Sequence, residues 1–164
     1  FWIDLASRVS TGREFPDGTA CTPGNVVVLS SEDDPSDTLK PRLRVHEADF
    51  ARIFWVDLEA VYVALDRHVP YLEELIKQVE PVSLIVLDPI SGHLGKCDSH
   101  KNAEVRAVLG PLAAFARRKR IAIVGVTHVP PAGGSSGQRT VSRGAGEAGA
   151  GRPAAGSTGV QNIP

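Results

Sequence analysis

Two short runs of apolar residues, Val26–Leu29 and Leu84–Leu87, constrain the fold of this chain more than any other sequence feature. Polar residues do not alternate with apolar ones in either run, as they would in a strand with one face exposed to solvent. An unbroken apolar run of this length is typical of a strand that is buried on both faces, as in a parallel sheet. We therefore expect a mostly parallel sheet with helices on both faces.

Helices and further strands alternate with these two runs along the chain. Apolar spacing and the positions of Gly and Pro predict helices near residues 1–12, 35–45, 71–79 and 102–120, and further strands at 52–58 and 121–126. The helix after Pro35 has the apolar residues Leu39, Leu43 and Val45. In the long helix, one face is marked by Val105, Val108, Leu109, Leu112, Ala113 and Ala116. Strands that alternate with helices predict an α/β fold.

The composition changes after residue 131. The segment 132–164 is rich in Gly, Ala, Ser and Arg, and its large apolar residues are Val141, Val160 and Ile163. Such a segment buries too little apolar surface to offset the entropy cost of ordering its backbone. We therefore predict a folded core over residues 1–131 and a largely disordered tail over residues 132–164.

Charge and hydropathy exclude several classes of protein. The net charge of −1 gives no general attraction to nucleic acid, so any DNA contact would need a local basic patch. No apolar run approaches the roughly 20 residues that cross a bilayer. The first residues lack the basic region of a signal peptide. Cys21 and Cys97 are typical of reduced thiols, so we expect a soluble cytoplasmic protein with no membrane partner.

Polar residues follow three of the predicted strands. Glu32 comes after the first strand, Asp88 after the clearest one, and Thr127 and His128 after the last. Right-handed crossovers place the carboxyl ends of parallel strands along one edge of the sheet, where such folds bind ligands. We therefore expect these side chains to share one edge and to form a candidate site.

Asp88 ends an apolar strand, as the acid of a Walker B element does. Phosphoryl-transfer enzymes need a carboxylate there because it holds Mg²⁺, often through water, beside the phosphates. Many α/β strands also end in an acid that only caps a helix or a turn. In isolation the motif slightly favours the capping role, and the metal-binding role stays open.

Glu32 has two interpretations of similar weight. A carboxylate at this edge could accept a proton from, and orient, the water that attacks a γ-phosphate. Alternatively, Glu32, Asp33 and Asp34 form the acidic first turn of the helix around Pro35, favoured by the helix dipole. For Asp33 and Asp34 we prefer this second interpretation.

His128 and Thr127 carry groups that could donate a hydrogen bond to a phosphate and detect its presence. A single histidine at a strand end is more often a polar residue with an ordinary hydrogen-bond partner. The shared placement of three polar positions at one edge favours the functional role.

Four segments in a fixed order carry a family resemblance: SSEDDPSDTLKPRL, LIVLDPI, DSHKNAEVR and VTH. They resemble the AAA-family ATPases of the RecA-like superfamily, in the group of hexameric RepA-type replicative helicases and related phage or plasmid ATPases. The resemblance covers residues 1–131 and is most specific in EDDP and DSHK. It implies a P-loop NTPase core in which Glu32 is catalytic, Asp88 is the Walker B aspartate that holds Mg²⁺, and His128 is the sensor of the γ-phosphate, with Thr127 beside the nucleotide.

The resemblance also implies a function and partners. The function is that of an ATP-hydrolysing motor domain that uses ATP and Mg²⁺. The partners are the neighbouring subunits of a homo-oligomeric ring, which complete each other's sites, and DNA as the substrate of the whole protein. The first helix, FWIDLASRVSTG, is similar to the helix that follows the phosphate loop in this family. We expect that loop to precede Phe1, so that the core is incomplete and residues 1–164 alone bind ATP weakly or not at all and are inactive.

The sequence departs from the family pattern after VTH. No lysine follows that segment, and Arg152 matches the arginine finger by position only. A non-catalytic α/β module that contacts protein or DNA is therefore the alternative function.

Two other clusters have a chemical and an ordinary interpretation. Zinc-ligand residue types gather at His93, Cys97, Asp98 and His100. Structural zinc sites usually pair two such clusters, so we favour a solvated loop. The basic run Arg117–Arg120 could contact a phosphate backbone, but such charges also collect at helix ends, and we favour that role.

The two tryptophans, Trp2 and Trp55, lie in no basic stretch of sequence. Aromatic platforms that stack on bases usually lie in a positively charged groove. We therefore expect both side chains to be core or interface aromatics.

Overall fold

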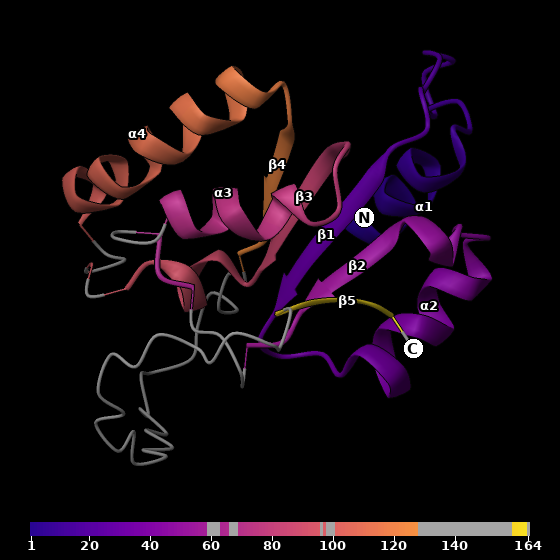
Figure 1. Ribbon diagram of the computed structural model, residues 1–164, viewed down its shortest axis with the longest axis horizontal. Helices are drawn as coiled ribbons and strands as arrows, with labels where there is room; N and C mark the ends of the chain where they lie inside the picture. The colour runs from indigo at the N-terminus through magenta and orange to yellow at the C-terminus, as the bar shows by residue number, and fades with distance from the viewer. Residues whose placement is uncertain (59–62, 66–68, 96, 98–100, 128–158, 164) are drawn as a thin grey trace, which may run out of the picture.

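The computed structural model describes residues 1–58, 63–65, 69–95, 97, 101–127 and 159–163 (Figure 1). The α-helices are α1 (Trp2–Thr11), α2 (Lys40–Val45), α3 (Val69–Lys77) and α4 (Asn102–Lys119). Shorter helical segments are η1 (Pro35–Leu39), η2 (Phe50–Arg52) and η3 (Ile90–His93). The strands are β1 (Asn25–Ser30), β2 (Ile53–Val56), β3 (Val82–Asp88), β4 (Ala122–Gly125) and β5 (Val160–Asn162).

The strands of the described residues form one five-stranded sheet in the order β4-β3-β1-β2-β5. β1, β2, β3 and β4 are parallel, and β5 is antiparallel to its neighbour β2. β1 and β3 make the central pair, in a register that sets Val27 opposite Ile85 and Ser30 opposite Asp88. The mostly parallel α/β fold predicted from the apolar runs is confirmed.

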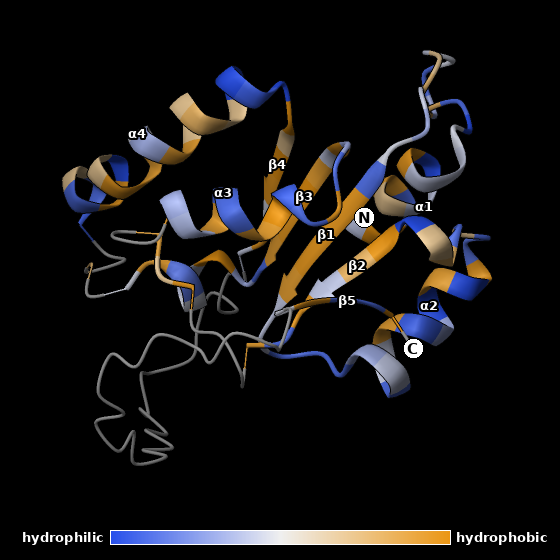
Figure 2. Ribbon diagram, in the orientation of Figure 1, coloured by the Kyte–Doolittle hydropathy of each residue, from blue (hydrophilic) through white to orange (hydrophobic). Residues whose placement is uncertain are grey.

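Helices cover both faces of the sheet (Figure 1). The core layer with α1, η1 and α2 includes Val26 and Val28 of β1, whereas the layer with α3 and α4 includes Val27 and Leu29. Successive side chains of a strand point to opposite faces, and here both faces are covered. The interior of β1, Val26–Leu29, is therefore apolar at every position, as the colouring of Figure 2 shows for the central strands.

α1 begins and ends as its sequence predicts. Gly12 follows its last residue with a φ of 76°, a left-handed conformation that favours glycine. The Gly12 N–H donates to the Arg8 carbonyl at 2.8 Å and so caps the helix. A Cβ at position 12 would also lie 2.8 Å from Cδ of Pro23. The turn after α1 thus needs glycine for two reasons.

The segment after Pro35 differs from the single helix predicted for it. A π-helical turn, η1, comes first, and its start is capped by the Asp34 side chain, which accepts from the N–H groups of Ser36 and Asp37. α2 then continues to Val45. Leu39 and Leu43 are fully buried, but Val45 is 81% exposed because it ends α2 on the outer side.

The buried face of α4 also differs in part from its prediction. Val108 and Leu112 are buried as predicted, but the third buried residue is Phe115, and Ala113 is exposed. Residues 108, 112 and 115 are spaced by four and three, which keeps them on one stripe of the helix.

No helix among the described residues is long and apolar enough to cross a membrane.

The structure describes residues 159–163 of the predicted tail. Val160–Asn162 form β5 against β2, and Val160 and Ile163 are buried. The structure therefore differs from the predicted disorder at these residues. The predictions for Val141, Arg152 and the rest of the segment 132–158 lie outside the described residues.

Candidate functional site

The ends of β1 and β3 lie level with each other at the carboxyl edge of the sheet. Ser30, the last residue of β1, pairs with Asp88, the last residue of β3. The next backbone N–H, that of Ser31, donates to the Asp88 carbonyl at 3.1 Å. At Glu32 the chain has therefore left β1 directly beside the end of β3, which carries Asp88.

The end of β4 lies on the other side of Asp88. Leu87 pairs with Gly125, and the Val126 N–H donates to the Leu87 carbonyl at 2.9 Å. The Val126 carbonyl in turn accepts from the Ile90 N–H at 2.8 Å. Thr127 follows and is exposed. Asp88 at the end of β3 thus lies between Glu32, which follows β1, and Thr127, which follows β4, at one edge of the sheet.

Asp88 is buried against the first turn of α1. Its carboxyl oxygen Oδ2 accepts a hydrogen bond of 2.7 Å from Nε1 of Trp2. Trp2 is 8% exposed and Asp88 is 7% exposed. The sequence predicts Trp2 as a core aromatic, and it is one, but the spacing of apolar residues holds no signal that its indole would reach Asp88.

The acidic residues after β1 have different surroundings. The Asp33 N–H donates to the Ser30 hydroxyl at 3.2 Å, and the Asp33 carboxylate accepts from Arg42 at 3.0 Å. The Asp34 carboxylate caps η1. The Glu32 side chain is exposed at the edge of the sheet. The structure therefore gives Asp33 and Asp34 structural contacts, and Glu32 is exposed at the same edge of the sheet as Asp88.

The loop after β3 packs against both neighbouring strand ends. A Cβ built at Gly92 would lie 3.1 Å from Oγ of Ser31. On the other side, a Cβ at Gly125 would lie 2.7 Å from Cδ1 of Ile90. The two glycines let this loop approach the segments that carry Glu32 and Thr127. Sequence reasoning missed them because their neighbours are distant in the chain.

His93, at the end of this loop, is a buried histidine (2% exposed). Its Nδ1 lies 3.2 Å from the Val63 carbonyl, and its own carbonyl accepts from the Leu65 N–H at 2.7 Å. Burial lowers the pKa of the imidazole below its ordinary value, although the carbonyls of Val63 and Leu29 act in the opposite direction. His93 therefore ties the loop after β3 to residues 63–65.

The zinc hypothesis gains no support from the part of the chain that the structure describes. In that part no group of three or more His, Cys, Asp and Glu side chains is placed to hold a metal ion. Asp98 and His100 of the predicted cluster lie outside the described residues, as does the predicted sensor His128.

A magnesium ion needs fewer protein ligands than zinc. Mg²⁺ in nucleotide sites is held by one or two carboxylates together with phosphates and waters. Asp88 supplies a fixed carboxylate at the edge where such a ligand would bind, with the Ser30 hydroxyl next to it in register. The oxygen donors at this edge are the type that Mg²⁺ prefers, so the residues fit the ion.

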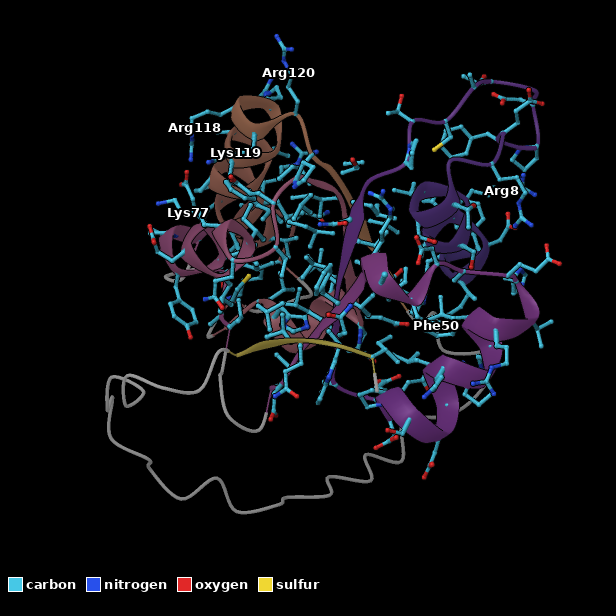
Figure 3. The ribbon with its side chains drawn as sticks, turned by 45° about the vertical axis from the view of Figure 1, so that its right-hand side comes forward. Arg8, Phe50, Lys77, Arg118, Lys119 and Arg120 are labelled. Carbon is cyan, nitrogen blue, oxygen red and sulfur yellow. The ribbon has the colours of Figure 1, made fainter. Side chains whose placement is uncertain are left out.

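The basic run at the end of α4 lies at the opposite edge of the sheet. Figure 3 shows Arg118, Lys119 and Arg120 gathered where α4 ends, just before β4 begins. Glu73 of α3 accepts from Arg118 at 2.9 Å and lies 3.4 Å from Lys119. Partial burial of Glu73 acts to raise the pKa of its carboxyl, but hydrogen bonds from these two cations outweigh it and hold that pKa below the ordinary value. Arg118 and Lys119 therefore connect α4 to α3.

Comparison with known proteins identifies the family. The model of a family described as an AAA domain matches residues 1–134, which include the ends of β1, β3 and β4. No curated protein and no solved structure matches the chain.

Proposed function

Because the chain belongs to the AAA-domain family of ATPases, we propose that it is the ATP-binding and ATP-hydrolysing motor domain of a RepA-like DNA helicase or a related DNA-replication ATPase. One observation carries the proposal: Glu32, Asp88 and Thr127 lie at the carboxyl ends of three adjacent parallel strands, at one edge. Open α/β sheets bind their ligands outside the carboxyl ends of the strands. The nucleotide would bind at this edge.

Asp88 is the residue that would hold Mg²⁺. Its position at the end of a buried central strand limits its motion, and the Trp2 indole fixes one of its oxygens. When bound, the ion neutralises charge on the phosphates of the nucleotide. The low exposure of Asp88 strengthens its interaction with a cation, because water screens that interaction less.

Glu32 is the proposed general base. Its segment is anchored at Ser31, whose N–H donates to the Asp88 carbonyl, so the base stays next to the metal-holding strand. Glu32 would take a proton from the water whose oxygen bonds to the γ-phosphorus, while the bond from that phosphorus to the bridging oxygen breaks. ADP and phosphate are the products.

Thr127 and His128 would complete the phosphate contacts. The exposed Thr127 follows β4 beside Asp88, and its hydroxyl can donate to a phosphate oxygen. His128 is the next residue, and as the sensor it would donate to the γ-phosphate and lose that contact when phosphate leaves. Loss of this hydrogen bond would couple hydrolysis to movement.

We extend the proposal to the assembly. The order of the EDDP, DSHK and VTH segments resembles that of hexameric motors, so a homo-oligomeric ring that acts on DNA is the expected working form. A neighbouring subunit would then complete each site.

Glu32→Gln in the natural full-length protein tests the proposal. The variant keeps the size of the side chain but removes the base, so it should retain nucleotide binding and lose at least about 100-fold in turnover, the scale of a general base. Glu14→Gln, another exposed position away from the edge, serves as the matched control and should be fully active. Unchanged ATPase activity in Glu32→Gln would remove Glu32 from this role.

The same assay separates the alternative function. A non-catalytic α/β module that contacts protein or DNA would show no Mg²⁺-dependent ATP hydrolysis in the unmodified full-length protein. Hydrolysis that Asp88→Asn abolishes would favour the motor.

A further inference from the structure

A hydrogen bond between residues 86 positions apart joins α1 to the end of β3. Nε1 of Trp2 donates to Oδ2 of Asp88 at 2.7 Å, and both side chains are less than one tenth exposed. We propose that Trp2 is a positioning residue that sets the orientation of the Asp88 carboxylate toward the Mg²⁺ of bound nucleotide. The inference rests on the proposed function and deepens it.

The chemistry of the indole suits this role. An indole ring has one N–H donor and no acceptor, so it can only donate to a carboxylate. A donor–acceptor distance of 2.7 Å is at the short end of the range for hydrogen bonds to charged oxygen, which are stronger than neutral ones. Because water has little access to either side chain, it competes weakly for the bond.

Both ends of the bond belong to rigid elements. Trp2 opens α1 and packs in the same core layer as Ala6 and Val28, which are fully buried. Asp88 is fixed by its register opposite Ser30 in the central pair of strands. The bond from Trp2 therefore restricts the rotation of the Asp88 carboxylate. Partners that orient the ligands of a metal in this way typically change metal affinity or activity when they are removed.

A purely structural role for the bond is the competing explanation, in which Asp88 only satisfies a buried indole. Trp55 supplies a comparison within the same core layer. Its Nε1 is buried and has no hydrogen-bond partner among the residues that the structure describes. Within the described part of the chain an indole of this layer thus lacks a partner, so satisfying a donor does not by itself explain the contact with Asp88.

A single-atom replacement tests the proposal in the natural full-length protein. Site-specific incorporation of 3-benzothienylalanine at position 2 replaces the indole N–H by sulfur and keeps the ring size. The Mg²⁺ concentration for half-maximal ATPase activity should rise by about 10- to 100-fold, the usual effect of losing such a partner. The same replacement at position 55 is the matched control, and it should leave the Mg²⁺ dependence unchanged.

A spectroscopic readout detects the bond without turnover. In ¹⁵N-labelled protein, the indole N–H resonance that disappears in Trp2→Phe belongs to Trp2. This resonance should move upfield in Asp88→Asn, because the charged acceptor is gone, while that of Trp55 stays in place. A Trp2 resonance that does not respond to Asp88→Asn would overturn the proposal.

The outcomes separate this proposal from the function on which it rests. Absence of Mg²⁺-dependent hydrolysis in the unmodified protein, or full activity of Asp88→Asn, would overturn the proposed function. An active enzyme whose Mg²⁺ dependence is unchanged by the sulfur replacement would overturn only the role of Trp2. A lower melting temperature with unchanged Mg²⁺ dependence would likewise assign the bond a structural role.

Discussion

Gly92 and Ser31 approach so closely that a side chain at position 92 would press on the Ser31 hydroxyl, with a Cβ–Oγ distance of 3.1 Å. Ser31 is also the residue whose N–H donates to the Asp88 carbonyl, and the next residue is Glu32. The loop after β3 is therefore in contact with the segment that carries the proposed base. A substitution at position 92 should therefore lower kcat more strongly than it lowers the free energy of unfolding.

Gly92→Ala should lower the turnover of the full-length protein. The methyl group needs a few tenths of an ångström of movement by the neighbouring segment, and we expect about a tenfold loss in kcat, since misplacement by 1 Å can cost about 100-fold. The melting temperature should change little, because alanine at a position without positive φ also lowers the entropy of the unfolded chain. Steady-state kinetics and thermal unfolding together check this prediction.

Gly110→Ala is the control for the same substitution. Gly110 lies inside α4 on its exposed side, and a Cβ built there meets no described atom within 4 Å apart from its chain neighbours and the backbone of its own helix. Alanine should leave kcat unchanged, and its gain in helix propensity should be offset because the ring of Pro111, the next residue, disfavours a helical residue that has a Cβ before it. Equal losses of kcat in both variants would contradict the specific contact between Gly92 and Ser31.

Leu43 and Val45 should respond oppositely to truncation although they lie two residues apart. Leu43 is fully buried and Val45 is 81% exposed. Leu43→Ala should cost about 2–5 kcal/mol of unfolding free energy. Val45→Ala should stay within about 0.5 kcal/mol of the parent. Urea unfolding of the two variants measures both values. A loss above about 1 kcal/mol in Val45→Ala, twice the expected limit, would contradict the exposed position of Val45.

His93 should make stability depend on pH. Burial lowers its pKa in the folded state from the ordinary value of 6.5, so the unfolded chain binds a proton more readily than the folded one. The stability from the neutral imidazole is therefore fully present above about pH 6.5 and is lost as the pH falls toward the folded-state pKa. For a single proton the steepest slope is about 1.4 kcal/mol per pH unit.

Urea midpoints of the parent and of His93→Gln at pH 7.5 and pH 5.5 test this prediction (both values chosen to lie about one unit from the ordinary pKa). Glutamine can keep a hydrogen bond to the Val63 carbonyl but does not titrate. The parent should lose more stability on acidification than the variant. An equal loss in both proteins would show that other groups cause the pH dependence.

The sheet was predictable from the sequence because burial on both faces leaves a direct record in the residue types. A strand such as β1 or β3 has to be apolar at successive positions, and turn residues mark where it ends. The right-handed connection between parallel strands then brings their carboxyl ends to one edge. The placement of Glu32, Asp88 and Thr127 at this edge follows from these two rules without any knowledge of side-chain contacts.

The remaining features depend on contacts between distant parts of the chain. Nothing near Trp2 in the sequence indicates that its indole reaches Asp88, because the bond depends on how α1 packs on the sheet. The approach of Gly92 to Ser31 has the same origin. Phe115 was missed for another reason. The predicted apolar face of α4 ran from Val105 and included Ala113 and Ala116, so it was centred closer to the exposed side of the helix than the face that is buried.

The distribution of tryptophan between the two core layers has a consequence for optical measurements. Both tryptophans of the chain, Trp2 and Trp55, belong to the layer formed with α1 and α2, and the layer with α3 and α4 has none. Intrinsic fluorescence therefore reports on one side of the sheet. Far-ultraviolet circular dichroism is weighted toward the other side, where the 18-residue α4 lies. Comparing the two signals during denaturation shows directly whether the halves of the domain come apart together.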